Sequence, residues 1–486
     1  MKLFVAVSLW VGLGGSAFGQ GGLFGPYFKT VSLNTKASGA GVATDVANFP
    51  LLVRLDASQA DEIFSQAAAT GGDIRVTNLA GTDPLSFEIE SWNKAEKKAT
   101  LWVLVPLVKG NDSSASFRIY WGREGALSLS SPSDVFDTAK GFQAVWHMNG
   151  SVGDELDATV NGFTASAVNG PTDTLGAIGG ARKLNGIDHR FTVSNSASGK
   201  LNFQLTDSYT LSAWVHPRAI TTLSSNGHAI IDKTDNQYEL QIYGGGNPKY
   251  WDLITRANGA FFQTSTSSDS LPAESAVGSW HLVSAIHRGA PIGGVIAETL
   301  YVDGVPINGI SNVYTSNSGR NLNFNVHLGT RSAGTAPGTS FSRFWNGMLD
   351  EIRISNVARS AAWIKLSYET QKPGSPKTVK VGATPVNVLT APEKRQAPLA
   401  SPLRVTRSGT GLLFTFEESL AARAALTLSN PSGRILWRTN IDLRATRTVT
   451  WDRNQTPPGI YSLRITLIDP AGKALRTLNQ KIPVMD

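Results

Sequence analysis

Short runs in which apolar and polar residues alternate follow one another along most of this chain, separated by segments rich in Gly, Asn, Asp and Ser. Alternation with a period of two is typical of a half-buried β-strand, and segments of that composition form turns. Between residues 20 and 140 the runs are LLVRLDA, GDIRVTN, LSFEIESW, ATLWVLVPLV and ASFRIYWG. Between residues 141 and 370 they include YTLSAWVHP, HAIIDKT, YELQIYGG, WHLVSAIHR, LYVDGV, NVHLGTR and MLDEIRIS. The pattern predicts an all-β protein with tandem β-sandwich domains at 20–140 and 141–370.

A helical pattern, a linker and a further small domain follow. SAAWIKLSYE predicts one short helix with Ser360 as its N-cap. Residues 371–402 hold six prolines and few large apolar side chains, so they are predicted to be a linker. Beyond it, RVTRS, LLFTFEE, AALTLSN, RILWRTN, TRTVTWD and GIYSLRITLID predict a set of strands. Residues 403–486 have about the size of a small immunoglobulin-like β-sandwich.

The N-terminal residues 1–19 are typical of an export signal. Lys2 is followed by the apolar run LFVAVSLWVGLG and then by the small-residue site around Ala17 and Gly19. The run is short for a bilayer, and no later segment approaches about 20 apolar residues, so no transmembrane segment is expected. A membrane anchor at residues 1–19 is the alternative. The chain contains no cysteine, which excludes disulfides and thiol chemistry.

The positive charge of the chain is concentrated at its C-terminal end. Residues 390–486 contain 14 Lys and Arg against 7 Asp and Glu, whereas the remainder of the chain is balanced. These basic residues are spaced along the predicted strands and form no basic arm, so a nucleic-acid partner is not expected. Contact with an acidic surface or with an export machinery is the preferred interpretation.

The run FEIESW places two glutamates, Glu88 and Glu90, two residues apart on one expected strand. Such residues share a face of the strand, roughly 6.5–7 Å apart along the chain. Retaining glycosidases hold their two carboxyl groups about 5–5.5 Å apart, so a catalytic pair has to be considered. A structural or ligand-contacting strand face is the alternative.

Other catalytic patterns are missing from the sequence. The seven histidines show no H-E-x-x-H motif or similar metal-ligand spacing, and they are interpreted as buried or surface residues without a catalytic role. A triad assembled from distant residues stays open. Asp350 and Glu351 are neighbours on an expected strand, so they should point to opposite faces and not act together on one bond.

Three parts of the chain resemble known families. YTLSAWVHP, SWHLVSAIHR, LYVDGV and FWNGMLDEIRISNVARSAAWI resemble a LamG-like, concanavalin A-type jelly roll. NFPLLVRLDA, GGDIRVTN, FEIESW, LWVLVPLV and IYWG resemble a bacterial extracellular family of unassigned function that commonly precedes LamG modules. NPSGRILWRTN, PPGIYSLRI and the closing KIPV resemble the sorting domain of bacterial type IX secretion. The resemblances imply two jelly-roll-type sandwiches followed by an Ig-like domain that contacts the secretion machinery.

The family comparison argues against glycosidase chemistry. Jelly-roll hydrolases of the laminarinase type carry E-x-D and a second Glu two or three residues later on one strand. Here Glu90 stands at the Asp position, and the second Glu would fall at Trp92 or Asn93. The sequence therefore predicts that the chain is not an enzyme, with a polysaccharide-degrading hydrolase as the alternative.

A structural calcium ion is the cofactor that the sequence suggests. DELDATVNG offers Asp157 and Asn161 as oxygen donors in a turn-rich loop, which suits a hard cation. In LamG-like domains an acid of this loop and the first acid of the DE-x-R-I motif hold one calcium, and by that resemblance Asp157 and Asp350 would share it. Without calcium, Asp350 would be a salt-bridge partner, for instance of Arg353.

These observations predict a secreted or cell-surface protein that binds a glycan or polysaccharide and mediates adhesion. Recognition would use aromatic faces that stack on sugar rings and polar side chains that read hydroxyl groups. The chain contains 12 Trp, although most Trp residues of β-sandwiches fill the core. A purely structural surface or matrix component is the remaining alternative.

Overall fold

The computed structural model describes residues 24–150, 153–195, 199–220, 227–233, 237–243, 250–257, 260–265, 276–291, 293–313, 324–333, 340–374, 378–383, 385–387, 403–408, 411–416, 423–430, 435–443, 445–452, 459–468 and 474–484. The chain divides into two compact units, Phe18–Ala391 and a second unit that contains Pro392–Asp486. The strands are antiparallel throughout the two units, as the alternating sequence pattern predicts. No helix of the described residues is long and apolar enough to cross a membrane.

The first domain of the larger unit is a sandwich of two small sheets. One sheet has the order β24-β1-β6-β3 with β25 beside β1, and the other has the order β2-β5-β4. Helix α2 begins at the N-cap Asp56, whose side chain accepts a hydrogen bond from the backbone N–H of Ser58. The elements are β1 (Tyr27–Leu33), β2 (Val46–Asp56), α2 (Ala57–Gln66), β3 (Arg75–Asn78), β4 (Phe87–Asn93), β5 (Lys98–Val108) and β6 (Ala115–Trp121).

Part of the predicted linker belongs to this first domain. The strands β24 (Val379–Val381) and β25 (Val386–Asn387) lie within the predicted linker 371–402 and pair with β1. Val381 is buried there although the segment is short and flanked by proline. Because a strand of two or three residues carries almost no periodic signal, the sequence could not separate it from a linker.

The second domain is a jelly-roll sandwich of two large sheets. Among the described residues, one sheet has the order β19-β18-β17-β12-β23-β10-β9 with β7 beside β23, and the other has the order β16-β15-β14-β13-β20-β11-β8. Alternate side chains of both sheets meet in a core that contains Trp146, Tyr209, Leu240, Trp251 and Val283. The chain reaches this domain through α3 (Pro132–Val135), which contacts β4 and β5 of the first domain. The elements are η1 (Thr138–Lys140), β7 (Phe142–Trp146), β8 (Ala165–Val168), β9 (Thr172–Leu175), β10 (Gly180–Asn185), β11 (Arg190–Val193), β12 (Tyr209–Pro217), β13 (His228–Asp232), β14 (Tyr238–Tyr243), β15 (Tyr250–Ala257), β16 (Ala260–Ser265), β17 (His281–Arg288), β18 (Val295–Val302), β19 (Val305–Val313), β20 (Val326–Leu328), β21 (Arg331–Ala333), β22 (Ser340–Ser342) and β23 (Asn346–Ser355).

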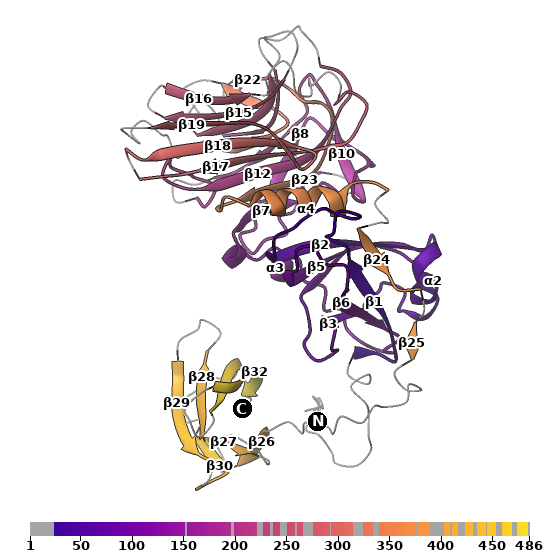
Figure 1. The fold of residues 1–486 in the computed structure, drawn as a ribbon, viewed down its shortest axis with the longest axis vertical. Coiled ribbons are helices and arrows are strands. Elements are labelled where there is room, and N and C mark those ends of the chain that lie inside the picture. The colour runs from indigo at the N-terminus through magenta and orange to yellow at the C-terminus, as the bar shows by residue number, and fades with distance from the viewer. Residues whose placement is uncertain are drawn as a thin grey trace, which may run out of the picture. The chain divides into compact units, whose positions relative to one another are not determined.

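Helix α4 (Ala361–Gln371) lies between the two sandwiches, beside β23 on one side and the first domain on the other (Figure 1). The predicted N-cap is confirmed, because the Ser360 hydroxyl accepts a hydrogen bond from the backbone N–H of Trp363 at 3.1 Å. Trp363 packs edge-on against Phe49 of β2, with ring centroids 5.0 Å apart. The helix therefore connects the two domains through apolar contacts.

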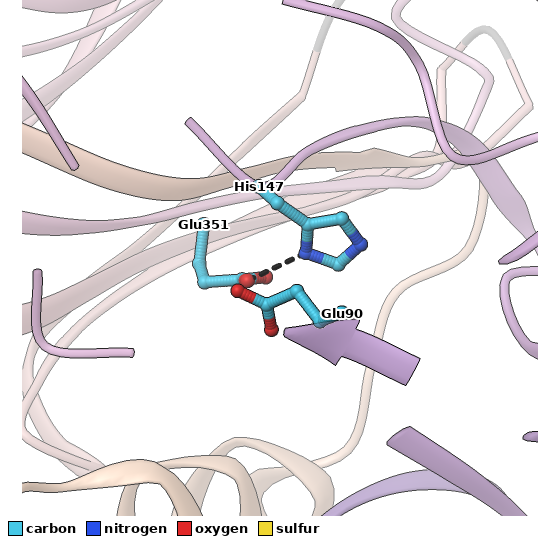
Figure 2. Close-up of side chains that lie close together, drawn as sticks. All are labelled: Glu90, His147 and Glu351. Atoms are coloured by element: carbon cyan, nitrogen blue, oxygen red, sulfur yellow. Dashed lines mark hydrogen bonds and ion pairs between the residues drawn. The ribbon is translucent and has the colours of Figure 1, made fainter. Parts of the chain in front are cut away.

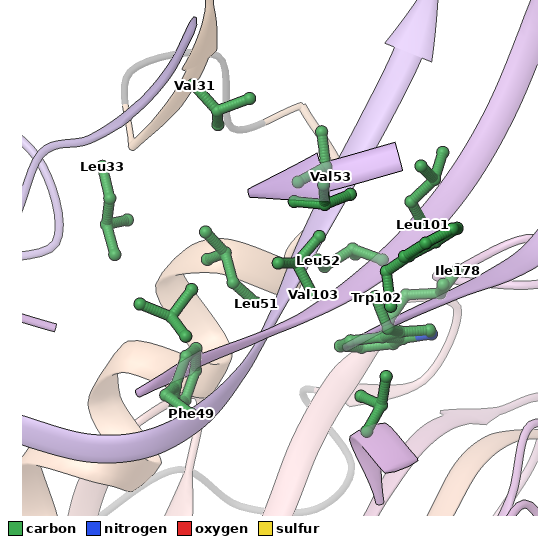
Figure 3. Close-up of a cluster of buried hydrophobic side chains, with 14 of the residues drawn as sticks. Val31, Leu33, Phe49, Leu51, Leu52, Val53, Leu101, Trp102, Val103 and Ile178 are labelled. Carbon is green, nitrogen blue, oxygen red and sulfur yellow. The ribbon is translucent and has the colours of Figure 1, made fainter. Parts of the chain in front are cut away.

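One continuous apolar core runs from the first domain into the jelly roll. It contains Phe49 and Trp102 of the first domain together with Ile178 and Trp214 of the second. Figure 3 shows Ile178 beside the side chains of β2 and β5. Burial of side chains of this size stabilises the folded state by about 1.5–3 kcal/mol each. The shared core therefore holds the two domains together in one compact unit.

The C-terminal unit is a small sandwich of its own. Its sheets have the orders β26-β27-β30 and β29-β28-β31-β32, and between them lie Phe414, Leu426, Leu463 and Trp451. This confirms the small β-sandwich predicted after the linker. The strands are β26 (Leu403–Ser408), β27 (Gly411–Phe416), β28 (Arg423–Ser429), β29 (Ile435–Asp442), β30 (Thr448–Asp452), β31 (Gly459–Ile468) and β32 (Ala474–Val484).

A buried lysine gives the jelly roll a pH dependence. Burial lowers the pKa of Lys233 from 10.5 to about 7, and its ammonium group donates to the carbonyl of Phe324 at 2.6 Å. Between about pH 7 and pH 10 the unfolded chain still holds this proton while the folded protein has released it, so raising the pH favours folding. From pH 7.5 to 9, the wild type should gain about 2 kcal/mol of unfolding free energy relative to Lys233→Met.

Denaturant unfolding of both proteins at the two pH values measures this difference. Lys98→Met, which removes a lysine with an exposed side chain, is the matched control and should show no such change with pH. If the unfolding free energy of the wild type does not rise with pH relative to that of Lys233→Met, the lowered pKa of Lys233 is contradicted.

Candidate functional site

Two β-bulges bring acidic side chains together where the two domains meet. In β4 the pairing with β5 shifts between Ile89 and Ser91, so Glu90 is the extra residue of a bulge. Glu88 and Glu90 both reach toward the jelly roll, as their two-residue spacing predicts, and Glu88 is buried. The strand FEIESW therefore contacts the neighbouring domain.

The second bulge lies in β23 and corrects a prediction. Leu349 and Ile352 both point into the jelly-roll core, and the pairing with β12 shifts between them. Glu351 has a φ of 49°, which places it in the left-handed region. Asp350 and Glu351 consequently share the outer side of the sheet and are both buried. The prediction that they point to opposite faces was wrong, because it assumed a regular strand.

His147, which follows β7, lies between these acids. Its Nδ1 is 2.6 Å from Oε1 of Glu351, and its Nε2 is 3.3 Å from Oε2 of Glu88. Figure 2 shows the carboxylate of Glu90 next to this pair. His147 is buried, and its interpretation as a histidine without a catalytic role stays a prediction. We call Glu88, Glu90, His147, Asp350 and Glu351 the acid–histidine cluster.

Aromatic and cationic side chains enclose the acid–histidine cluster. The guanidinium of Arg353 donates to Oε2 of Glu351 at 2.6 Å and lies 4.5 Å over the Trp102 ring. The indole N–H of Trp102 donates to Oε2 of Glu90 at 2.8 Å, and the amide of Asn149 donates to Oε1 at 3.2 Å. Only Glu90 and Asn149 are partly or fully exposed, so the cluster meets solvent at that end.

Burial and mutual repulsion set the charge of the acids. Burial, together with the charges of Glu351 and Glu88, raises the pKa of Glu90 to about 7. Burial and the charge of Glu351 raise the pKa of Asp350 well above its ordinary value. Burial would also raise the pKa of Glu351, but His147 and Arg353 outweigh it and lower that pKa. The two neighbouring glutamates, Glu90 and Glu351, therefore differ in protonation near neutral pH.

A protonated and an ionised carboxyl group side by side could serve as acid and base. One small cavity lies beside Glu351. The cavity that touches Glu351 and Arg353, under helix α4, has a volume of about 20 Å³, enough for about one water molecule. A sugar ring does not fit that cavity, which Glu90 does not line, whereas the cluster itself meets solvent at Glu90 and Asn149.

The predicted calcium ligands Asp157 and Asn161 are engaged by donors of the chain itself. Oδ1 of Asp157 accepts from the backbone N–H groups of Val145 and Thr159, and Oδ2 accepts from the Thr159 hydroxyl and the Phe163 N–H. Oδ1 of Asn161 accepts from the ammonium of Lys200 at 2.6 Å. A calcium ion would have to displace these donors, so the loop does not fit the ion in this conformation. Calcium binding there stays a prediction.

Asp350 lies in the acid–histidine cluster. Its Oδ2 accepts from the backbone N–H of Ile178 at 2.8 Å, and its Oδ1 is buried without a hydrogen-bond partner. Arg353, the salt-bridge partner expected for Asp350, pairs with Glu351 instead. The described contacts of Asp350 involve no residue of the Asp157 loop.

A second candidate surface is the outer face of the seven-stranded sheet. Tyr243 ends β14 and Tyr250 begins β15, and they pair with each other across the hairpin. Their rings stack with centroids 5.1 Å apart and an interplanar angle of 26°. Both are partly exposed, and neither belongs to the jelly-roll core. The pair presents an aromatic platform on this face.

Polar side chains lie next to the tyrosines on the same face. The amide of Gln241 donates to Asp252 at 2.9 Å, and Arg343 donates to both Gln241 and Glu239. The charge of Asp252 contributes, after burial, to the raised pKa of Tyr250, which places that carboxylate near the phenol. Aromatic rings beside fixed polar groups are the elements of a sugar-binding surface.

Sequence reasoning missed both groups as sites. The distant partners of Glu88 and Glu90 are His147 and Asn149, which follow β7, and Glu351 of β23, and no local motif marks them. The tyrosines carried a usable signal, since YELQIYGG and KYWDLI flank a glycine-rich turn. Two tyrosines at equal distances from a hairpin turn face each other across it.

Two family models match the larger unit. Residues 188–365 match the Concanavalin A-like lectin/glucanases superfamily, and residues 70–149 match a domain of unknown function, DUF2341. The chain therefore contains a concanavalin A-like lectin/glucanase domain, preceded by a DUF2341 domain. This confirms the LamG-like resemblance and the resemblance of the preceding domain to a family without assigned function.

Other comparisons are more distant. No curated protein sequence matches the chain. Among solved structures, the binding domain of botulinum neurotoxin serotype D is 13% identical with a TM-score of 0.34, covering 68% of this chain and 73% of that one. The serotype C1 binding domain is 12% identical with a TM-score of 0.35, covering 71% and 94%.

Proposed function

We propose that this protein is exported to the cell surface and binds glycans through its concanavalin A-like domain, in an adhesive rather than a hydrolytic role. The observation that carries the proposal is the Tyr243–Tyr250 platform beside Gln241 and Asp252. Stacked phenol rings offer flat apolar faces for sugar rings, and their hydroxyls add polar contacts at the edge.

The arrangement of the domains supports this choice of surface. The outer side of the eight-stranded sheet is covered near β12 and β23 by helix α4 and by the first domain, as Trp214 and Trp363 of the shared core indicate. The seven-stranded sheet has no such cover from the first domain among the described residues. On the outer face of the seven-stranded sheet Gln241 and Asp252 are buried, so a ligand has the partly exposed rings of Tyr243 and Tyr250 available.

The hydrolase alternative is less well supported. Glu88 and Glu351 are buried, and the cavity next to Glu351 has about the volume of one water molecule. A glycosidase needs its two carboxyl groups on either side of a bound sugar. We therefore propose no enzymatic activity for the acid–histidine cluster.

A glycan array probed with the full-length protein tests the proposal against a purely structural role. Binding should be confined to a related set of glycans and should be competed by the same glycan in solution. A structural component would give no competable binding on the array or on insoluble polysaccharides, and that result would overturn the proposed function.

The C-terminal sandwich is proposed to direct export, and its removal should trap the protein. Residues 403–486 form a separate unit with a core of their own, so their deletion should leave the unit Phe18–Ala391 folded. In the producing cell, surface protein should fall to background while the truncated protein accumulates inside the envelope. Surface labelling and fractionation measure this, and normal display of the truncated protein would contradict a sorting role.

A further inference from the structure

With all four of its carboxyl groups ionised, the acid–histidine cluster would carry more negative than positive charge, even with His147 protonated. It contains four carboxyl groups, and the guanidinium groups near them are those of Arg54 and Arg353. Arg54 directs its hydrogen bonds to the backbone oxygens of Ala177 and Gln371 instead of to a carboxylate. Uncompensated negative charge is strongly disfavoured in a buried site, where it must be neutralised by protons or by a cation.

Three side chains offer atoms at the spacing that a metal ion requires. One oxygen each of Glu90 and Glu351 and one ring nitrogen of His147 lie within 4.8 Å of one another. Small side-chain rotations would bring them to the roughly 2.0–2.2 Å typical of Zn²⁺ with nitrogen and oxygen ligands. Figure 2 shows the three groups pointing toward one another.

One further observation points to a ligand at this place. Oδ1 of the fully buried Asp350 has no hydrogen-bond partner, although its neighbours are the same acids. The loop that covers the cluster also packs closely on it at two glycines, of which Gly176 additionally lies against the backbone oxygen of Gly180. A Cβ at Gly176 would lie 2.5 Å from Oδ2 of Asp350, and one at Gly179 would lie 2.9 Å from Oε1 of Glu90.

We propose that the acid–histidine cluster binds one divalent transition-metal cation, of which Zn²⁺ is the representative, through Glu90, His147 and Glu351, with Asp350 as a third acid beside them. A mixed set of imidazole and carboxylate ligands suits zinc rather than calcium, which prefers oxygen ligands alone. Four ionised carboxylates, two guanidinium groups and a divalent cation give zero net charge when His147 is neutral. The protons held by the acids leave when the cation binds.

Glu88 has a different part in this site. Its Oε2 faces Nε2 of His147, while Nδ1 faces Glu351. A carboxylate that holds the second ring nitrogen fixes the tautomer and the orientation of a metal-bound imidazole. Nδ1 is therefore the ligand atom, and Glu88 is a positioning residue.

The site would connect the two domains, because Glu90 belongs to the first domain and His147 and Glu351 belong to the jelly roll. This inference does not depend on glycan binding.

The test is calorimetric titration of the full-length, chelator-treated protein with ZnCl₂, together with its melting temperature with and without zinc. We expect one equivalent of zinc and a higher melting temperature. Glu90→Gln should weaken binding at least about tenfold, since it removes a charged ligand.

A matched control is available in the jelly roll. His287 and Glu298 form another buried pair, 2.8 Å apart, without the further acids, so Glu298→Gln should leave zinc affinity unchanged. No zinc binding by the wild type, or an unchanged affinity in Glu90→Gln, would overturn the proposal. X-ray absorption of the zinc-loaded wild type does not depend on the variants folding. One imidazole with oxygen ligands is expected, and two or more imidazoles would contradict the site.

Discussion

Replacing His147 with alanine is expected to lower the free energy of unfolding of the larger unit by about 3–5 kcal/mol, the range found when one partner of a buried ion pair is removed. The imidazole lies between Glu351 and Glu88, and both carboxylates are buried. The charges of these two acids raise the pKa of His147 well above its usual value despite its burial, so the ring compensates their charge. The variant leaves acids without that compensation and opens a gap beside Trp102, whose ring stacks on the imidazole.

Differential scanning calorimetry of the full-length protein measures this loss in the transition of the larger unit. His281→Ala is the matched control, because His281 pairs with a single acid, Asp303, at a less deeply buried place, so its loss should cost less than the loss of His147. Equal small effects in both variants would show that the acid–histidine cluster does not hold the domains together.

Most of the fold could be predicted from the sequence because the strands follow a simple rule. In YTLSAWVHP alternate side chains enter the jelly-roll core, and the apolar pattern records that alternation. In MLDEIRIS the alternation holds from Ile352 onward, beyond the bulge. The helix from Ala361 was predictable because Ser360 supplies a local cap signal. Helix α2 was missed, since ASQADEIFSQ directly continues the strand run LLVRLDA and its buried residues are few.

The candidate site could be predicted only in part. FEIESW indicated a shared face for Glu88 and Glu90, and the structure confirms that both acids face one neighbour. Their partners depend on the contact between two domains and on a bulge at Glu351. Neither the contact nor the bulge can be recognised from the spacing of residues in the sequence. A left-handed residue inside a strand is a conformational cost that only the surrounding packing makes tolerable.

The loop around Asp157 illustrates the opposite error. Asp, Asn and Gly in close succession suit a calcium loop and an ordinary turn equally well, because both need short oxygen-bearing side chains. The hydrogen bonds to Val145, Thr159 and Phe163 show that this aspartate organises the turn itself. Composition cannot separate the two uses, since it does not reveal which donors the backbone supplies.

Glycan binding should be lost when the Tyr243–Tyr250 platform is removed. Aromatic anchors in recognition surfaces contribute about 2 kcal/mol or more, so Tyr243→Ala with Tyr250→Ala should weaken binding by about 30-fold or more. The double variant Tyr243→Phe with Tyr250→Phe keeps the stacked rings and loses only their hydroxyls, so it should retain most of the affinity for the glycan. Because both rings are partly exposed, neither variant should disturb the core.

The direct measurement is titration of the full-length wild type and both double variants with a glycan that binds on the array. The proposed site predicts strong loss for the alanine protein, near-normal affinity for the phenylalanine protein and unchanged melting temperatures for both. Wild-type affinity in the alanine protein would contradict glycan recognition at this face of the jelly roll.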